Sequence, residues 1–131
     1  MSANLDLVRS IYADWERGNF SSVEWADPKI EFELADGPSP GRRIGVAAME
    51  EAWRDFLTAW GDYRIVPDEY RELDDARVLV LSRVRGRGEL SELQLEQRRA
   101  AMFQIRGGKA IKYVVWWDRD RALADLGLEG G

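Results

Sequence analysis

The chain has 131 residues, of which 45% are hydrophobic and 33% are charged, and its formal net charge is −5. This balance is typical of a folded globular domain with one hydrophobic core, and we expect a single domain over residues 1–131. Nucleic acids and anionic membrane surfaces both require a basic face on their partners, so the acidic balance argues against either as a partner.

The sequence contains neither cysteine nor histidine. The first absence excludes disulfides, thiolate nucleophiles and cysteine-bound zinc, and the second removes the commonest metal ligand and the commonest general base. We therefore expect no cofactor and no metal site, and only carboxylates, tyrosines, lysines and arginines remain for chemistry. Six tryptophans predict an aromatic surface, either in a core or around a ligand.

The sequence has no apolar run of about 18 residues that could span a membrane. Its start, Met-Ser-Ala-Asn-Leu-Asp, lacks the basic and apolar regions of a signal peptide. These patterns lead us to expect a cytoplasmic protein.

Two long helices and one short helix are predicted from hydrophobic spacing. Leu5, Val8, Tyr12 and Trp15 recur at helical intervals, and Gly18 provides a C-terminal stop. A second helix follows Gly45 and extends to residue 60, with an apolar stripe made of Val46, Met49, Trp53, Phe56 and Trp60. Residues 119–126 form a short closing helix that Asp118 is expected to cap.

The remaining segments show the alternation of β-strands. In residues 29–34, Ile30, Phe32 and Leu34 alternate with Glu31 and Glu33, which predicts a half-buried strand. Further strands are expected at 64–73, 77–85, 93–106 and 111–118, the last two joined by a Gly107-Gly108 turn. The order helix, strand, helix and antiparallel meander predicts an α+β fold with helices on one face of a curved sheet.

The final strand, Ile-Lys-Tyr-Val-Val-Trp-Trp-Asp at 111–118, is apolar on both faces. One row should face a core or pocket. The other row contains Val114 and Trp116, with Met102 beside it on the preceding strand, and would form an apolar patch of a kind that monomers seldom expose. We therefore expect a homodimer in which a two-fold axis buries this patch on both subunits.

Several short motifs resemble the nuclear-transport-factor-2-like superfamily. Arg17-Gly18-Asn19-Phe20, followed by Ala-Asp-Pro-Lys-Ile-Glu-Phe at 26–32, resembles its start, and the end of the chain from Gly108-Lys109 to Ala122-Leu123 resembles its SnoaL-like branch. The resemblance implies a cone-shaped α+β barrel, a strongly bent antiparallel sheet wrapped over N-terminal helices around an internal pocket. Members include ketosteroid isomerases, polyketide cyclases, epoxide hydrolases and dehydratases, so fold alone does not define a function.

The functional residues of these enzymes match this sequence only in part. The proton-shuttling carboxylate of the isomerases matches Glu33, but their oxyanion-binding acid matches Ala101 and their tyrosine matches Ile11. The strand carboxylate of limonene-epoxide hydrolases matches Val115. We therefore expect neither activity, because the donors that stabilise an oxyanion and the acid that opens an epoxide are missing.

The lining of the pocket matches the isomerases better than the catalytic residues do, because a tryptophan of the isomerase pocket matches Trp117. The resemblance therefore implies a mostly aromatic pocket. Side chains with the same inward direction on neighbouring elements extend the lining. The expected ligand-binding residues are Tyr12 and Trp15 in the first helix, Trp53, Phe56 and Trp60 in the second, Ala101 and Phe103 in the long strand, and Tyr113, Val115 and Trp117 in the last strand. The alternative is that these side chains fill the cone.

Two functional hypotheses follow. The first is a protein that binds a small apolar or aromatic molecule in the cone. The second is an isomerase, cyclase or dehydratase that uses Glu33 as a proton carrier, although inward Phe32 and Leu34 would turn Glu33 outward unless the strand carries a bulge. Tyr12, Tyr63 and Asp118 are the other polar candidates.

Overall fold

The computed structural model describes residues 3–20, 22–37, 40–88 and 94–128, with side chains omitted at 55–62, 87–88 and 94–95. The elements in chain order are α1 (Ala3–Glu16), β1 (Ala26–Leu34), β2 (Gly41–Ile44), α2 (Val46–Ala59), β3 (Trp60–Glu72), β4 (Arg77–Gly88), β5 (Gln94–Arg106), β6 (Lys109–Trp116) and α3 (Arg119–Asp125). No helix in the described ranges is long and apolar enough to cross a membrane.

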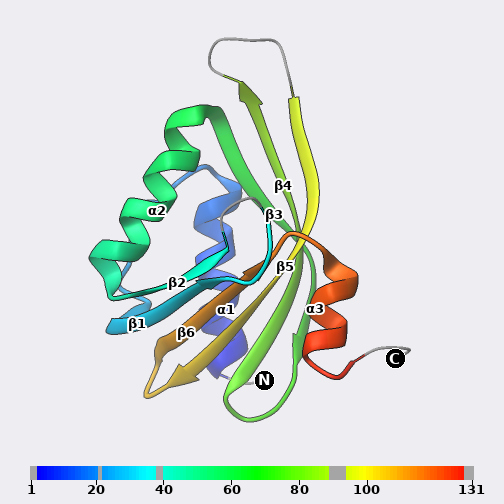
Figure 1. Cartoon of the computed structure of the whole chain (residues 1–131). Helices are drawn as coiled ribbons and strands as arrows, with labels where there is room; N and C mark the ends of the chain where they lie inside the picture. The colour runs from blue at the N-terminus through cyan, green and yellow to red at the C-terminus, as the bar shows by residue number, and fades with distance from the viewer. Residues whose placement is uncertain (1–2, 21, 38–39, 89–93, 129–131) are drawn as a thin grey trace.

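The six strands form one strongly bent sheet in the order β2-β1-β6-β5-β4-β3 (Figure 1). The predicted α+β class and cone are confirmed. Two details of the prediction were wrong. Strand β1 runs parallel to β6, with Phe32 beside Tyr113, so the sheet is mixed and not wholly antiparallel. In the described ranges β2 and β3 are its edges, so the barrel is open.

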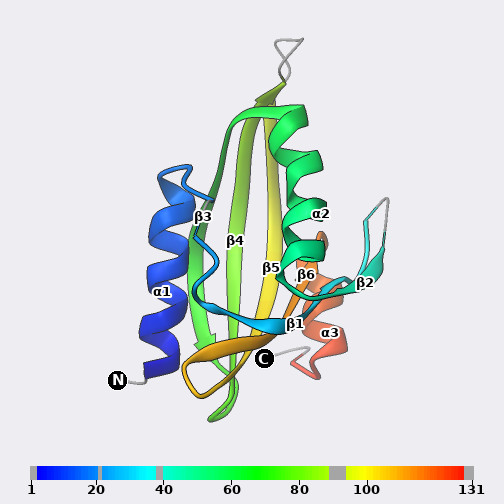
Figure 2. The same cartoon turned by 90° about the vertical axis from the view of Figure 1, so that its left-hand side faces the viewer.

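The concave face of the sheet holds the main core, and α1 and α2 cover it (Figure 2). Helix α1 packs against β3 and β4 because Val8, Ile11, Tyr12 and Trp15 lie on one face and are buried. Gly18 ends this segment with a φ of +82°, a conformation that costs glycine little. The predicted helical stripe therefore became the inner wall of the cone.

Strand β2 was not predicted. All four of its residues are exposed, so their sequence carries no alternation of apolar and polar positions. Pairing with the neighbouring β1 defines the strand, and Arg42 lies opposite Glu33 in the register. The strand ends at Ile44, and the N–H of the next residue, Gly45, donates to the Ile30 carbonyl at 2.7 Å.

The convex face carries a second core under α3 (Figure 1). Met102, Val114 and Trp116 belong to it, with exposed fractions of 6%, 4% and 4% within the single chain. The alternation in the sequence predicted an uncovered patch of these three residues, but α3 packs on β5 and β6 and covers them. They are thus not available for a dimer interface, and dimerisation itself stays a prediction that sedimentation velocity would test.

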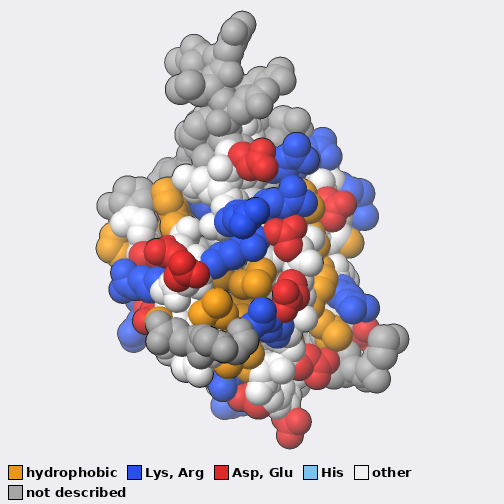
Figure 3. Space-filling model, turned by 90° about the vertical axis from the view of Figure 1, so that its right-hand side faces the viewer, with side chains coloured by type: hydrophobic (Ala, Val, Ile, Leu, Met, Phe, Trp, Pro, Cys, Tyr) orange, Lys and Arg blue, Asp and Glu red, His pale blue; other side chains and the backbone are white. Residues whose placement is uncertain are grey.

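Figure 3 views the molecule from the side of α3 and the convex face. Basic and acidic side chains alternate across this surface, with smaller hydrophobic areas between them. The Trp116 indole is joined to α3 by a hydrogen bond, in which Nε1 donates to Asp125 Oδ2 at 2.9 Å. Trp116 thus links the outer core to the last helix by both apolar and polar contacts.

We predict that Trp116→Ala lowers the free energy of unfolding by about 3–5 kcal/mol, because it leaves a cavity beneath α3 and removes the bond to Asp125. Urea denaturation would measure the loss. Ile44→Ala is the matched control, because Ile44 is 59% exposed and its loss should change stability by less than about 0.5 kcal/mol. Equal losses in the two variants would show that α3 does not seal this face.

Candidate functional site

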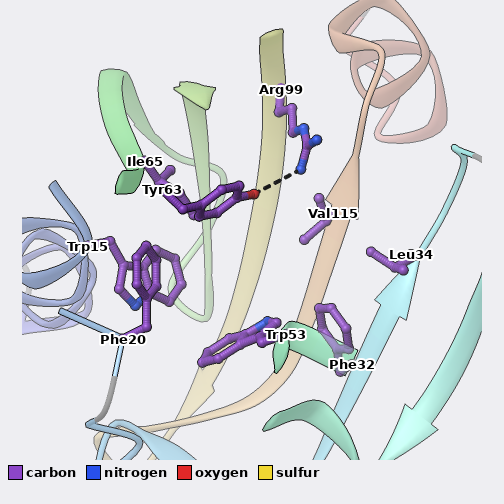
Figure 4. Close-up of a pocket in the computed structure, with 9 residues that line it drawn as sticks. All are labelled: Trp15, Phe20, Phe32, Leu34, Trp53, Tyr63, Ile65, Arg99 and Val115. Atoms are coloured by element: carbon purple, nitrogen blue, oxygen red, sulfur yellow. Dashed lines mark hydrogen bonds between the residues drawn. The ribbon is translucent and has the colours of Figure 1, made fainter. Parts of the chain in front are cut away.

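A cavity of about 50 Å³ lies inside the concave face, between α1, α2 and the sheet (Figure 4). We call it the cone cavity. Its described lining residues are Trp15, Phe20, Phe32, Leu34, Trp53, Tyr63, Ile65, Arg99 and Val115. Six of these nine are only partly buried, so the cavity lies close to the surface. Apart from Arg99, Tyr63 and the indole N–H groups, the side chains of this wall are hydrocarbon.

The polar end of the cavity is formed by Arg99 on β5 and Tyr63 on β3. Arg99 Nη1 donates to the Tyr63 hydroxyl at 3.4 Å, as the dashed line in Figure 4 marks. Arg99 is only 6% exposed, and charged residues are seldom buried to this extent. A guanidinium carries only donors, so this end of the cavity presents N–H groups.

Neutral side chains hold the Arg99 guanidinium in position. Gln97, two residues earlier on β5, accepts from Arg99 Nε at 3.2 Å and from Nη2 at 2.7 Å. The Trp117 ring lies against the guanidinium, 4.3 Å from ring centroid to Cζ, a cation–π contact. The Gln97 amide thus fixes the direction of the planar guanidinium, and the Trp117 indole packs against the guanidinium face.

Trp117 is itself held by the loop after β1. Asp36 Oδ1 accepts from the Trp117 backbone N–H at 2.5 Å. Gly37 has a φ of +93°, and a Cβ added to it would lie 3.0 Å from Trp117 Cδ2 and Cε2. A side chain at this position would crowd the ring, and glycine avoids that contact. The indole is thus enclosed between Gly37 and Arg99.

A second arginine anchors the backbone of Arg99 from the convex side. Arg119 Nε donates to the Arg99 carbonyl at 3.2 Å, and its Nη2 donates to the Ser82 carbonyl at 2.8 Å and to Asp68 Oδ2 at 2.6 Å. Asp68 also accepts from Arg83 Nε at 2.9 Å. This network joins β3, β4, β5 and α3 behind the polar end of the cavity.

Burial controls the ionisation of the two tyrosines nearest to Arg99. It raises the pKa of Tyr63, and the positive charge and hydrogen bond of Arg99 lower it only in part. Burial also raises the pKa of Tyr113, with a smaller increase from Tyr63 and an opposing effect of Arg99. Both phenols therefore stay protonated at neutral pH, where they can donate hydrogen bonds.

Known proteins match this chain in structure and not in sequence. A scan against protein-family models finds no match, and neither does a search of curated proteins. An NTF2-like protein of unknown function from Burkholderia pseudomallei is 21% identical, with a TM-score of 0.78 over 95% of this chain and 97% of that one. TerC, co-crystallised with polyporic acid, is 22% identical, with a TM-score of 0.76 over 95% and 98%. A candidate SnoaL-like polyketide cyclase from Jannaschia sp. CCS1 is 12% identical, with a TM-score of 0.75 over 98% and 94%.

The chain has the NTF2-like fold. The resemblance drawn from its motifs is therefore confirmed at the level of the fold, with neighbours of the SnoaL-like kind among the similar structures.

The sequence-predicted lining residues divide into three groups within the NTF2-like cone. Trp15, Trp53 and Val115 line the cone cavity. Tyr12, Ala101, Phe103 and Tyr113 are buried in the core and are absent from the described lining. The side chains of Phe56 and Trp60 lie outside the described residues. The structure thus combines both alternatives from the sequence, because most of the cone is filled and a small cavity remains.

Trp117 and Glu33 are not among the described residues that line the cavity. Trp117 was expected to line the cavity, but it supports Arg99 from the side. Glu33 is on β1 between Phe32 and Leu34, which both line the cavity, so its side chain points to the opposite face. The β1 bulge that could have reversed this direction lies earlier, between Ala26 and Glu31.

Arg99 is the main residue that the sequence analysis missed. It follows the same alternation on β5 as Phe103 and Ala101, so extending this row by two residues would have found it. Tyr63 was only a minor candidate. The expected role of Asp118 is confirmed, since its side chain accepts from the N–H groups of Asp120 and Arg121 and caps α3. Among the described residues, no three acidic side chains gather as metal ligands would.

We predict that Gly37→Ala destabilises the protein more than Gly107→Ala. Both residues have positive φ, but a Cβ at Gly107 would meet nothing within 4 Å. Backbone strain should cost about 1–3 kcal/mol in each variant. Contact with the Trp117 ring should add about 1–3 kcal/mol at Gly37. Chemical denaturation of the two variants would measure this difference, and equal losses would mean that the ring moves aside.

We also predict that Asp68→Asn destabilises the protein at neutral pH and not in acid. Burial tends to raise the pKa of Asp68, but hydrogen bonds from Arg119 and Arg83 outweigh it and hold the pKa below the ordinary value of 3.8. The stabilisation is therefore present above about pH 3.8 and is lost as the pH falls through the lower folded value.

Urea unfolding of wild type and Asp68→Asn between pH 7 and pH 3 would test this dependence. Glu72→Gln, an exposed position on the same strand, is the control. A stability difference that stays constant across this range would contradict the proposed ionic origin.

Proposed function

We propose that this protein binds a small, mainly apolar or aromatic organic molecule in the cone cavity. The observation that carries the proposal is the composition of the wall, where aromatic and aliphatic side chains surround a single polar end. Small-molecule sites typically combine a concave apolar lining with a few polar groups that fix the orientation of the ligand.

The size of the cavity limits the ligand. A volume of about 50 Å³ accommodates a few water molecules, whereas a benzene-sized group occupies an empty cavity of about 150 Å³. A ring can therefore enter only if part of the wall moves. Phe20 and Trp53 are apolar aromatic lining side chains that are only partly buried, so their outward rotation is the route that we propose.

The structural neighbours are compatible with this function. TerC was co-crystallised with polyporic acid, and the neighbour from Burkholderia pseudomallei has no known function. These similarities are below 25% identity, so the support that they give is limited to a cone of the same shape.

No observation favours the hypothesis of an enzyme that uses Glu33 as a proton carrier. Its side chain points away from the cavity, and its neighbours on the adjacent strands are Arg42 and Val114. The positions that match the oxyanion donors of the isomerases, Ile11 and Ala101, are buried apolar residues. The carboxylate and the donors required for enolate chemistry therefore do not converge at the cavity.

The proposal can be tested with a neutral probe, benzyl alcohol. We expect saturable shifts of tryptophan indole N–H signals in two-dimensional NMR. Val115→Phe should weaken binding by about tenfold or more, because the added ring occupies the cavity.

Val66→Phe is the matched control. Val66 is a partly buried valine that follows Ile65 on β3, and its side chain points to the other face, so this variant should bind normally. Binding that survives unchanged in Val115→Phe would contradict a ligand site in the cone cavity, and so would the failure of every small aromatic probe to bind the wild type.

A further inference from the structure

We infer that the ligand of the cone cavity is an organic acid, whose carboxylate or enolate oxygens bind Arg99 and Tyr63. This inference rests on the proposed function and adds the chemical class of the ligand. Its basis is the meeting of a cationic guanidinium and a protonated phenol at one end of an otherwise apolar cavity.

The chemistry of Arg99 selects an oxygen acceptor. The guanidinium carries five N–H donors in a planar fork and no acceptor, so it recognises carboxylates better than it recognises hydroxyl or amine donors. Hydrogen bonds between a guanidinium and a carboxylate are also about twice as strong as those between neutral groups. Arg99 is 6% exposed and therefore lies in low-dielectric surroundings, which strengthen its preference for an anion.

The orientation of Arg99 is fixed before any ligand arrives. Gln97 receives two hydrogen bonds from the guanidinium, and Trp117 supports its face at 4.3 Å. Behind β5, Arg119 bonds to the backbone carbonyl of Arg99. Side chains that are already ordered lose little entropy on binding. This arrangement therefore favours a ligand-binding role for Arg99 over a purely structural one.

Tyr63 adds a neutral donor to the same end. Its oxygen lies 3.4 Å from Arg99 Nη1, and burial keeps the hydroxyl protonated at neutral pH. A carboxylate has two oxygens and can contact both groups at once. The apolar remainder of the acid would lie against Phe32, Leu34 and Trp53, on the other side of the cavity (Figure 4).

The first experiment compares benzoate with benzamide, which has the same shape and no charge, against the wild-type protein by NMR titration at pH 7. We expect benzoate to bind about tenfold more tightly or better, the gain of one charge-assisted hydrogen bond over a neutral one. This comparison needs no variant, so a folding defect cannot obscure its result.

Three variants then locate the source of the preference. Arg99→Gln should remove the preference for benzoate over benzamide. Tyr63→Phe should lower the affinity for benzoate, while the tryptophan NMR signals show that the variant is still folded. Arg98→Gln is the matched control, because it removes the same charge from the adjacent, exposed position on the other face of β5. It should keep the preference for benzoate.

The outcomes separate the two proposals. Equal affinity for benzoate and benzamide in wild type would overturn the inference of an acid and leave a neutral ligand site intact. A benzoate preference that Arg99→Gln retains would also overturn it, because the anion would then bind elsewhere, and its loss in Arg98→Gln would place that binding at the surface. Failure of benzyl alcohol, benzoate and benzamide alike would overturn the proposed function together with this inference.

Discussion

The fold depends on the packing of aromatic rings around Trp15. This side chain reaches from α1 into the concave sheet, and the centroids of six aromatic rings lie 4.9–6.4 Å from its own. They come from both long helices, from the segment after α1 and from strands β5 and β6: Tyr12, Phe20, Trp25, Trp53, Phe103 and Tyr113. Edge-to-face and offset pairs of this kind add about 0.5–1.5 kcal/mol each to the burial of their area. Removal of Trp15 would therefore loosen both helices from the sheet together.

The same aromatic packing defines the size of the candidate site. Rings fill the cone from the α1 side, where Phe103 and Tyr113 stack with centroids 4.6 Å apart. The cavity remains where the rings give way to Leu34, Val115 and the Arg99 guanidinium. Packed interiors leave few voids larger than a water molecule, so a void beside a nearly buried cation is a feature that a ligand could use. The site thus lies at the edge of the aromatic cluster, which supplies Trp15, Phe20 and Trp53 to its wall.

The two faces of the sheet are connected through β5 and β6. On the concave face, Arg99 and Trp117 form the polar end of the cavity and its support. On the convex face, Arg119 bonds to the Arg99 carbonyl and to Asp68, while Trp116 bonds to Asp125 of α3. Trp116, the last residue of β6, and Trp117, which follows it, therefore serve opposite faces. A disturbance of α3 would reach the polar end of the cavity through these contacts.

Apart from the exposed strand β2, the sequence by itself determined the elements, because apolar residues repeat at 3.6 or 2 positions wherever a helix or strand buries one face. It also determined the inward row Tyr113-Val115 and the buried row Val114-Trp116. Only the tertiary structure decided what covers the second row, since burial by α3 and burial by a second subunit require the same apolar pattern. It also decided the parallel pairing of β1 with β6, which no local spacing specifies. The assembly of Arg99, Tyr63, Trp117 and Gly37 joins segments from four places in the chain, and contacts across such sequence distances depend on how the sheet bends.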